Sequence, residues 1–200
     1  ATMQILRIDS ATTGEASVSR KLTAAIAEHF RAKHPEAKWV ERDFATDPLP
    51  HLDRASTGAI RQPQETHDEA MKAAFPKERA VLDEFLASDI VILGVPMYNF
   101  SVPSSIKAWI DRLGAPGVTF RYSEAGPEGL AGGRRVIVAS ARGGQYEMDG
   151  PFEHQETYLR DLFAFIGITD VEFIRAERTG FGPEAVAQAL AEAKRQIARL

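Results

Sequence analysis

A hydroxyl-rich stretch, residues 10–19, holds the first side chains that could bind a ligand. It contains Ser10, Ser17, Val18 and Ser19, and it lies between a predicted strand and a predicted helix. The first turn of a helix has backbone N–H groups without internal partners, so this stretch suits a phosphate monoester. The alternative is that Ser17 or Ser19 only caps the helix. The glycine patterns of dinucleotide-binding loops and Walker loops do not occur in the sequence.

A second stretch follows an apolar run and could receive a planar ring with hydrogen-bonding edges. Its residues are Pro96, Met97, Tyr98, Asn99 and Phe100. They offer backbone amides together with flat, apolar side chains, which is the usual lining of a small-molecule site. The alternative is that Met97 and Phe100 merely pack beneath a loop.

A third stretch also follows an apolar run and contains a pair of glycines. Its residues are Ala141, Arg142, Gly143 and Gly144, with Tyr146 two residues beyond. Paired glycines allow the backbone to approach a ligand closely. The alternative is an ordinary tight turn, for which glycine is also preferred.

The order of the predicted elements places these three stretches at one edge of a sheet. Strands are predicted at 3–9, 38–43, 90–93, 135–140 and 171–174. Helices are predicted at 20–33, 66–87, 104–113, 151–166 and 183–200. Such alternation predicts an α/β fold, a flavodoxin-like three-layer sandwich whose five-stranded parallel sheet has the order 2-1-3-4-5 and helices on both faces. Ligands bind at the carboxyl edge of such sheets. A phosphate site, a flat-ring site and a glycine-lined wall at that edge describe a pocket for flavin mononucleotide (FMN).

Three details of this prediction depend on proline and on chain length. Residues 44–63 form a long segment with prolines, which we expect to be a functional loop or the cover of a pocket. Pro76 is expected to break or kink its helix near Phe75. Residues 114–133 form a second long excursion, in which 118–122 is expected to be a short hairpin strand.

Composition argues against several other classes of protein. The 200 residues are expected to form one domain, 1–200. The net charge is −4 without a basic block, which argues against a nucleic-acid partner. The chain has no cysteine, so disulfides and thiol chemistry are excluded. Without a membrane-length apolar run or a signal-peptide pattern, we expect no membrane partner and a cytoplasmic location. The histidines lack metal-ligand spacing, so no metal is expected, and no nucleophile elbow of a hydrolase is present.

Motifs of one family run through nearly the whole chain in order. They are the serines of 10–19, Val95-Pro-Met-Tyr-Asn-Phe100, Gly117-Val-Thr-Phe-Arg-Tyr122, Gly126-Pro-Glu-Gly-Leu130, Arg142-Gly-Gly144 and Phe165-Ile-Gly-Ile-Thr-Asp170. In these motifs the chain resembles the FMN-dependent NADH azoreductases, also described as FMN-dependent NADH:quinone oxidoreductases. The Pro-Met-Tyr-Asn-Phe and Val-Thr-Phe-Arg-Tyr stretches are specific, whereas the serines alone are not.

The resemblance implies non-covalently bound FMN, NADH or NADPH as co-substrate, a small quinone or azo compound as substrate, and a homodimer with active sites at the interface. It implies that the phosphate end is held by Ser10, Ser17, Val18 and Ser19. It implies that the isoalloxazine is lined by Met97 to Phe100 and Ala141 to Gly144, with Pro96 and Tyr146 beside them. It assigns substrate contacts to Phe100, Phe120, Tyr122 and Phe165, and a place on the mobile rim to Arg61. Similar proteins often carry serine where this chain has Ala141, so a hydroxyl contact to the flavin is missing.

The chemistry would belong to the cofactor, because the chain has no redox side chain of its own. The hypothesis is a ping-pong cycle in which a nicotinamide passes a hydride to flavin N5, leaves, and is replaced by a quinone or azo compound that accepts the hydride. Backbone amides near the N1–O2 edge would stabilise reduced anionic flavin. No side-chain acid or base is assigned, and solvent, Tyr122 or Tyr146 could supply protons.

Two other functions fit the same pocket. A flavodoxin-type electron carrier would expose the flavin edge to a protein partner, but such carriers are typically shorter and more acidic, and the excursions 44–63 and 114–133 resemble pocket walls. A flavin reductase would release reduced FMN to a partner oxygenase. Turnover of NADH with a quinone by the purified protein would separate the enzyme from the carrier, and flavin that dilutes away would favour the reductase.

Overall fold

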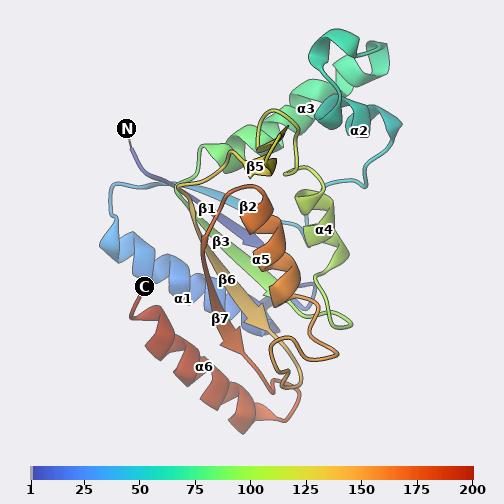
Figure 1. The fold of residues 1–200 in the computed structure, drawn as a ribbon. Coiled ribbons are helices and arrows are strands. Elements are labelled where there is room, and N and C mark those ends of the chain that lie inside the picture. The colour runs from blue at the N-terminus through green and yellow to red at the C-terminus, as the bar shows by residue number, and fades with distance from the viewer. Residues whose placement is uncertain (1) are drawn as a thin grey trace.

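Five parallel strands form the central sheet of the computed structural model, which describes residues 2–200 (Figure 1). The strands are β1 (Gln4–Asp9), β2 (Lys38–Asp43), β3 (Ile90–Pro96), β6 (Arg135–Ala141) and β7 (Asp170–Ala176). Their order in the sheet is β2-β1-β3-β6-β7, and every neighbouring pair is parallel. This confirms the predicted flavodoxin-like fold, because the order is 2-1-3-4-5 when only the strands of this sheet are counted.

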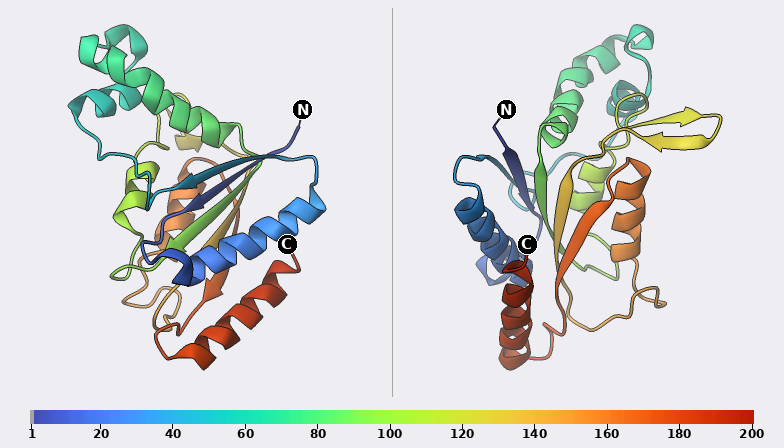
Figure 2. Two further views of the ribbon diagram at one scale, coloured as in Figure 1. Left: turned by 180° about the vertical axis from the view of Figure 1, so that it is seen from behind. Right: turned by 60° about the vertical axis from the view of Figure 1, so that its left-hand side comes forward.

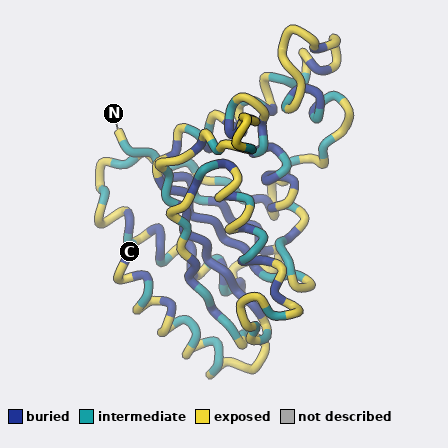
Figure 3. Tube along the Cα trace, in the orientation of Figure 1, coloured by how far each residue is buried: buried dark blue, intermediate teal, exposed yellow. Residues whose placement is uncertain are grey.

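Helices cover both faces of the sheet (Figure 2). On one face lie α1 (Val18–Lys33) and α6 (Pro183–Ile197), and on the other lie α3 (Glu69–Leu86), α4 (Ser104–Ile110) and α5 (Glu156–Phe165). Each layer buries its own apolar cluster against the strands. Figure 3 shows that burial is concentrated in the sheet and on the inner sides of the helices.

The strand β3 shows why both faces must be covered. Val91 and Leu93 join the cluster beneath α3, α4 and α5, whereas Ile90 and Ile92 join the cluster beneath α1 and α6. All of them are buried. A strand covered on both faces loses the alternation of a half-exposed strand, which is why residues 90–93 are apolar without interruption.

The helix α2 (Arg54–Arg61) lies inside the long segment that the sequence indicates to be a loop, so that expectation is wrong for these residues. Asp53 begins the helix, because its carboxylate accepts a hydrogen bond from the Ser56 N–H at 2.9 Å. Gly58 then packs closely against α3, since a Cβ built on it would lie 2.4 Å from Met71 Cε. The helix has only three apolar residues, Ala55, Ala59 and Ile60, which are too few to indicate a helix between Pro50 and Pro63 in the sequence.

Pro76 does not break α3. The helix continues without interruption from Glu69 to Leu86, so the break expected near Phe75 is wrong. Proline removes the N–H partner of the Lys72 carbonyl, but both residues are exposed and water can satisfy that carbonyl. Together with α2, the first turns of α3 project beyond the amino edge of the sheet (Figure 1).

The start of α5 also differs from the expectation. The helix begins at Glu156 and not at Pro151. The reason is the Glu153 carboxylate, which accepts hydrogen bonds from the N–H groups of Gln155 and Glu156 at 2.6 Å each. These bonds satisfy the first donors of the helix and fix where it starts.

A two-stranded hairpin occupies much of the second excursion. β4 (Phe120–Ser123) pairs antiparallel with β5 (Gly126–Gly129), so the strand expected at 118–122 is present and begins two residues later. The hairpin rests on the turn between α5 and β7. Gly129 and Gly167 touch there through their backbones, since a Cβ built on Gly129 would lie 2.1 Å from the Gly167 nitrogen.

Short 3₁₀ helices at Gly14–Ala16 and Gln64–Thr66 complete the helical elements of residues 2–200. Within the same residues, no helix combines the length and the apolar character needed to cross a bilayer.

Replacing Gly129 with alanine is expected to lower the free energy of unfolding by about 1–3 kcal/mol, because the new methyl group would overlap the Gly167 backbone. Gly114→Ala is the matched control, since a Cβ on Gly114 meets no atom within 4 Å. Alanine there should be neutral or stabilising by up to about 1 kcal/mol. Denaturant titrations of both variants measure the difference, and equal stabilities would contradict the close hairpin contact.

Candidate active site

The three stretches predicted to bind a ligand meet at the carboxyl edge of the sheet. They follow β1, β3 and β6, and hydrogen bonds join them. The Tyr98 hydroxyl lies 3.0 Å from both the backbone nitrogen and the hydroxyl oxygen of Thr12. The Met97 N–H donates to the Ala141 carbonyl at 2.8 Å. Because β1 and β3 are neighbours that are not consecutive, this edge is also the switch point of the sheet.

Ser17 caps α1, which is the alternative that the sequence left open for the first stretch. Its hydroxyl oxygen accepts a hydrogen bond from the Arg20 N–H at 3.2 Å and lies 3.1 Å from the Ser19 hydroxyl. This cap satisfies the Arg20 N–H group only, so other N–H groups at the helix start remain without an acceptor in the helix. The N–H groups of Val18 and Ser19 belong to the first turn, where a helix offers no internal acceptor.

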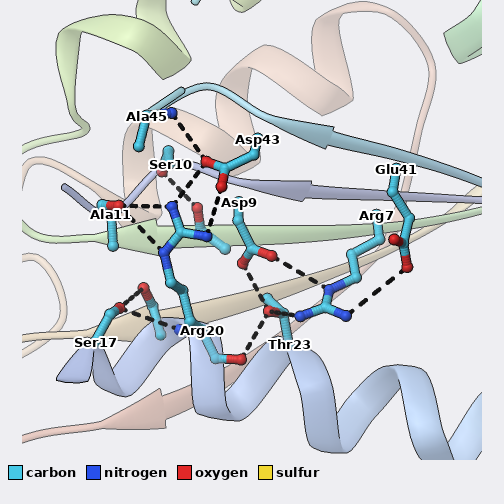
Figure 4. A network of polar contacts seen from close by, with 12 residues as sticks. Arg7, Asp9, Ser10, Ala11, Ser17, Arg20, Thr23, Glu41, Asp43 and Ala45 are labelled. Atoms are coloured by element: carbon cyan, nitrogen blue, oxygen red, sulfur yellow. Dashed lines mark hydrogen bonds and ion pairs between the residues drawn. The ribbon is translucent and has the colours of Figure 1, made fainter. Parts of the chain in front are cut away.

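Arg20 ties the first stretch to the ends of two strands (Figure 4). Its guanidinium donates to the Ala11 carbonyl at 3.2 and 2.7 Å and to the Asp43 carboxylate at 2.9 and 2.7 Å. The hydrogen bonds from Arg20 hold the pKa of Asp43 below its usual value, and those bonds raise the pKa of Arg20. Ser10 adds a further tie, because its buried hydroxyl donates to the Gly94 carbonyl at 2.7 Å. The stretch therefore leaves the sheet from a fixed position.

Asp9 is a buried carboxylate beneath the switch point (Figure 4). Burial raises the pKa of Asp9 above its usual value, while the hydrogen bond from the Thr23 hydroxyl at 2.7 Å and the charge of Arg7 at 3.3 Å act in the opposite direction. A Cβ built on Gly94 would lie 2.8 Å from the Asp9 carboxylate. The carboxylate therefore requires a residue without a side chain where β3 passes it.

The second stretch folds into a tight turn with two left-handed residues. Asn99 has φ 49° and Phe100 has φ 72°, and Tyr98 and Ser101 exchange backbone hydrogen bonds at 3.0 and 3.2 Å. A left-handed backbone is uncommon for a bulky residue such as Phe100 and costs about 1–3 kcal/mol. The ring of Phe100 packs against Phe152 with centroids 5.1 Å apart, which helps to hold this conformation. Such strain is concentrated at functional sites.

Several backbone N–H groups at this edge are available to a ligand. Those of Asn99, Phe100, Gly143 and Gly144 have no hydrogen-bond acceptor within residues 2–200. A Cβ built on Gly143 would meet no atom within 4 Å, so open space lies beside the backbone there. Tyr146 covers the second glycine, since its hydroxyl would lie 3.0 Å from a Cβ on Gly144. Donors beside open space can bind the polar edge of a flat ring.

The Arg142 side chain points into the protein and away from this open space. It is 1% exposed, forms an ion pair with the buried Glu153, and donates from Nη2 to Gln155 Oε1 at 2.8 Å. Any contact between Arg142 and a ligand is therefore limited to its backbone.

A fourth loop, residues 177–182, supports the third stretch, and the sequence prediction missed it. Its N–H groups donate to the carbonyls of residues 142–144 at 2.8 to 3.2 Å. The sequence does carry a signal there, Gly180-Phe-Gly-Pro183, directly before the helix predicted at 183–200. Phe152 was also missed. It is 56% exposed and follows Gly150-Pro151 in a segment predicted to be helical.

Most of the predicted substrate residues lie at the opposite, amino edge of the sheet. Phe120 packs against Tyr122 and Phe165, with ring centroids 5.6 and 4.8 Å apart. These residues belong to the hairpin and to the last turn of α5, which lie at that edge (Figure 2). Arg61 is exposed at the end of α2, and only Phe100 lies at the carboxyl edge. One chain alone does not bring the predicted cofactor and substrate residues together.

A groove of about 900 Å³ runs between α4 and α5. Its lining includes Ser101, Lys107, Asp111, Gly150 and Tyr158. Ser101 directly follows the second stretch, so the groove begins beside it. Within residues 2–200, the groove included, no three metal-binding side chains are grouped so that they could hold an ion.

Comparisons with known proteins agree with this architecture. A family profile described as Flavodoxin-like fold matches residues 3–200. An FMN-dependent NADH:quinone oxidoreductase of Rhizobium meliloti (strain 1021) is 52% identical over 201 residues, which cover 98% of this chain and 96% of that protein. A protein of the same description from Ralstonia nicotianae (strain ATCC BAA-1114 / GMI1000) is 50% identical over 192 residues, covering 94% and 92%.

Solved structures with a similar fold include two azoreductases. An azoreductase from Bacillus anthracis str. Sterne has a TM-score of 0.84 at 28% identity, with all of both chains covered. An FMN-dependent NADH-azoreductase from Bacillus anthracis str. Ames Ancestor, in complex with FMN, has a TM-score of 0.85 and covers 100% of this chain and 99% of that one. Its sequence identity is 24%, so this second likeness is one of fold.

Arg20→Met is expected to lower the free energy of unfolding by about 1–3 kcal/mol, because the Ala11 carbonyl and the Asp43 carboxylate lose a charged donor. Arg195→Met is the matched control. Arg195 pairs with Glu192 on the exposed side of α6, and such pairs contribute about 0–1 kcal/mol. Urea titrations at pH 7 compare the variants, and equal losses would show that the Arg20 contacts are no stronger than a surface ion pair.

The stability difference between wild type and Arg20→Met should also shrink on acidification. Arg20 lowers the pKa of Asp43 in the folded state. The stabilisation from this contact is therefore present above the ordinary Asp pKa of 3.8 and is lost as the pH falls through the folded-state value. The same titrations between neutral pH and pH values below 3.8 test this, and a difference that grows on acidification would contradict it.

Proposed function

The chain belongs to the flavodoxin-like family and to its FMN-dependent NADH:quinone oxidoreductases, and we propose that it reduces quinones and aromatic azo compounds with electrons from NADH or NADPH. It is an FMN-dependent oxidoreductase. One observation carries the finer proposal. A helix start, a strained turn and a pair of glycines with unpaired N–H groups converge at the switch point of the sheet.

The first stretch fits the phosphate end of FMN. The N–H groups of Val18 and Ser19 and the hydroxyls of Ser17 and Ser19 lie at the start of α1, where the helix dipole favours an anion. Arg20 is already paired with Asp43, and Lys21 lines a hollow between α1 and α6 together with Leu190 and Lys194. Phosphate binding would therefore depend on neutral N–H and O–H donors.

The second and third stretches fit the isoalloxazine ring. The unpaired N–H groups of Asn99, Phe100, Gly143 and Gly144 would donate to polar atoms at its edge. Fixed donors of this kind stabilise negative charge that develops during reduction. Ala141 contributes no hydroxyl, and its carbonyl already accepts a hydrogen bond within the fold.

Bound FMN would supply the redox chemistry, with a hydride passing from the nicotinamide through N5 to the acceptor in a ping-pong cycle. The residues of the chain would position and shield the reactants. Phe100 packs against Tyr146 and Phe152 with ring centroids 6.1 and 5.1 Å away, and this aromatic wall offers a surface on which a nicotinamide or a quinone can stack in turn. No side-chain acid or base is assigned.

The proposal includes a homodimer whose active sites lie between the subunits. Phe120, Tyr122 and Phe165 lie at the edge of the sheet away from the cofactor loops, so a second copy would have to bring them there. Tyr122 is 73% exposed and Phe165 is 38% exposed, and large exposed aromatic side chains are typical of binding surfaces. The groove between α4 and α5 begins beside the cofactor loops and would lie at this interface.

The visible spectrum of the purified protein tests the cofactor and the reaction. We expect bands of oxidised flavin that bleach with NADH under anaerobic conditions and return when a quinone is added. With both substrates varied, double-reciprocal plots should be parallel, because the two substrates use one site in turn. A protein that remains colourless after incubation with FMN would overturn the proposal.

The same experiment separates two other functions. A flavin that bleaches with NADH but does not reduce quinones without an added protein would favour a flavodoxin-type electron carrier. A flavin that is lost on gel filtration and then turns over as a substrate would favour a flavin reductase.

Mixed dimers test where the active site lies. Gly143→Trp would fill the open space at the cofactor edge, and the double variant Tyr122→Ala/Phe165→Ala would remove the exposed aromatics of the hairpin edge. Each variant alone should be inactive. Co-expressed copies that pair at random should regain about a quarter of the wild-type activity, because half of the dimers would then contain one intact site. No recovery in mixed dimers would show that both sets of residues act within one subunit.

A further inference from the structure

We propose that Gln155 is a positioning residue that sets the distance between the two flavin-ring loops, residues 96–100 and 141–146. The inference rests on the proposed function for the identity of the ligand. Gln155 immediately precedes α5 and is 0% exposed, so it cannot touch a ligand itself. Its effect would be transmitted through the ends of β3 and β6.

The Gln155 side chain is hydrogen-bonded both to the end of β6 and to the end of β3. Its Oε1 accepts from the Ser140 hydroxyl at 2.7 Å and from Arg142 Nη2 at 2.8 Å. Its Nε2 donates to the Pro96 carbonyl at 3.1 Å and to the Val95 carbonyl at 3.4 Å. An amide has one oxygen with two lone pairs and one nitrogen with two hydrogens, so its whole capacity is used. One side chain thus joins the carboxyl ends of two neighbouring strands.

The chemistry of the partners requires an amide at this position. Arg142 can only donate, so an acceptor must face β6, whereas the carbonyl of Pro96 can only accept, so a donor must face β3. A carboxylate would provide no donor for β3. An apolar side chain would leave polar groups of both strands buried without partners, which is costly.

Glu153 holds Gln155 in this place. Its carboxylate pairs with Arg142 and accepts from the N–H groups of Gln155 and Glu156 at 2.6 Å each. Both the backbone and the side chain of Gln155 are therefore fixed by buried partners. Arg142 Nε is buried without a partner, but the other side-chain polar atoms of the network are hydrogen-bonded. Such a buried network is rigid, so its geometry is passed on to the loops it joins.

The two loops depend on this link more than the phosphate stretch does. Besides Gln155, they are connected by the Met97 N–H bonded to the Ala141 carbonyl at 2.8 Å and by the packing of Phe100 against Tyr146, with ring centroids 6.1 Å apart. A flat ring that takes hydrogen bonds from Asn99 or Phe100 on one side and from Gly143 on the other would sense any change in their separation. The first stretch is held instead by Arg20, at the ends of β1 and β2. Gln155 should therefore affect binding of the flavin ring and not of the phosphate.

The test compares FMN with riboflavin, which has the same ring and no phosphate. Gln155→Met keeps a similar volume and removes the hydrogen bonds, and Ser140→Ala removes one of them with a smaller change. Glu78→Gln is the matched control, because Glu78 forms a comparable buried ion pair with Arg112 between α3 and α4. Dissociation constants of both flavins, the visible circular dichroism of the bound flavin and the flavin midpoint potential are measured for each variant.

We expect Gln155→Met to weaken binding of FMN and riboflavin by the same factor, about tenfold or more, and to shift the circular dichroism and the potential. Ser140→Ala should change the dissociation constants, the circular dichroism and the potential in the same direction, but by less. If Gln155→Met does not fold, Ser140→Ala alone tests the proposal. Glu78→Gln should lower the thermal stability and leave both dissociation constants within about twofold. Gln155→Met and Ser140→Ala variants with unchanged flavin binding and spectra would overturn the proposal, and so would a loss confined to FMN.

Amide hydrogen exchange of the flavin-free protein separates this proposal from the proposed function. Gln155→Met should speed exchange in residues 96–100 and 141–146, and Glu78→Gln should not. Unchanged exchange in both segments would overturn the positioning role whether or not flavin binds. Faster exchange in a protein whose wild type binds no flavin would support the link between the loops and would overturn the proposed function instead.

Discussion

Burial of β3 on both faces is the constraint on which the rest of the structure depends. Ile92 packs in one layer and Leu93 in the other, so a shift of one residue along the strand would exchange the two faces of its side chains. The position of the strand end is therefore fixed, and with it the start of the turn at Asn99 and Phe100. Helices occupy both faces of the sheet, so polar chemistry is left to the edges (Figure 2). The carboxyl edge combines the start of α1 with unpaired backbone N–H groups of the second and third stretches.

Two arginines beside the candidate site are neutralised within the protein. Arg20 pairs with Asp43, and Arg142 pairs with Glu153 in a fully buried contact. Breaking a buried pair leaves an uncompensated charge, so these residues are strongly constrained without needing to touch a ligand. What faces the open space is a set of neutral N–H donors on fixed backbone. Such a site selects a ligand by the geometry of its hydrogen bonds more than by net charge.

Much of the fold and part of the site could be predicted from the sequence. Apolar runs at 90–93 and 136–139, separated by helices, determine a parallel sheet, and a parallel sheet brings the three strand-end stretches to one edge. Side-chain directions could not be obtained in this way. Arg142 faces inward because Glu153, eleven residues later, accepts its charge, and no local pattern indicates this. The position of Phe120 and Phe165 at the other edge follows from how the hairpin rests on α5, which is likewise a tertiary property.

The contact between Gly129 and Gly167 has a consequence for how this chain can diverge. At most packing contacts both residues can change during evolution, because a larger side chain on one side is accommodated by a smaller one on the other. Here neither partner has a side chain to give up. A Cβ on Gly129 would overlap the Gly167 nitrogen at 2.1 Å, and a Cβ on Gly167, where φ is 94°, would lie 3.0 Å from the Gly129 backbone. A first substitution on either side has no second substitution that repairs it without moving the backbone. Single substitutions at these two glycines are therefore not tolerated. The hairpin and the turn beneath it can change only together, through an insertion, a deletion or a different loop conformation.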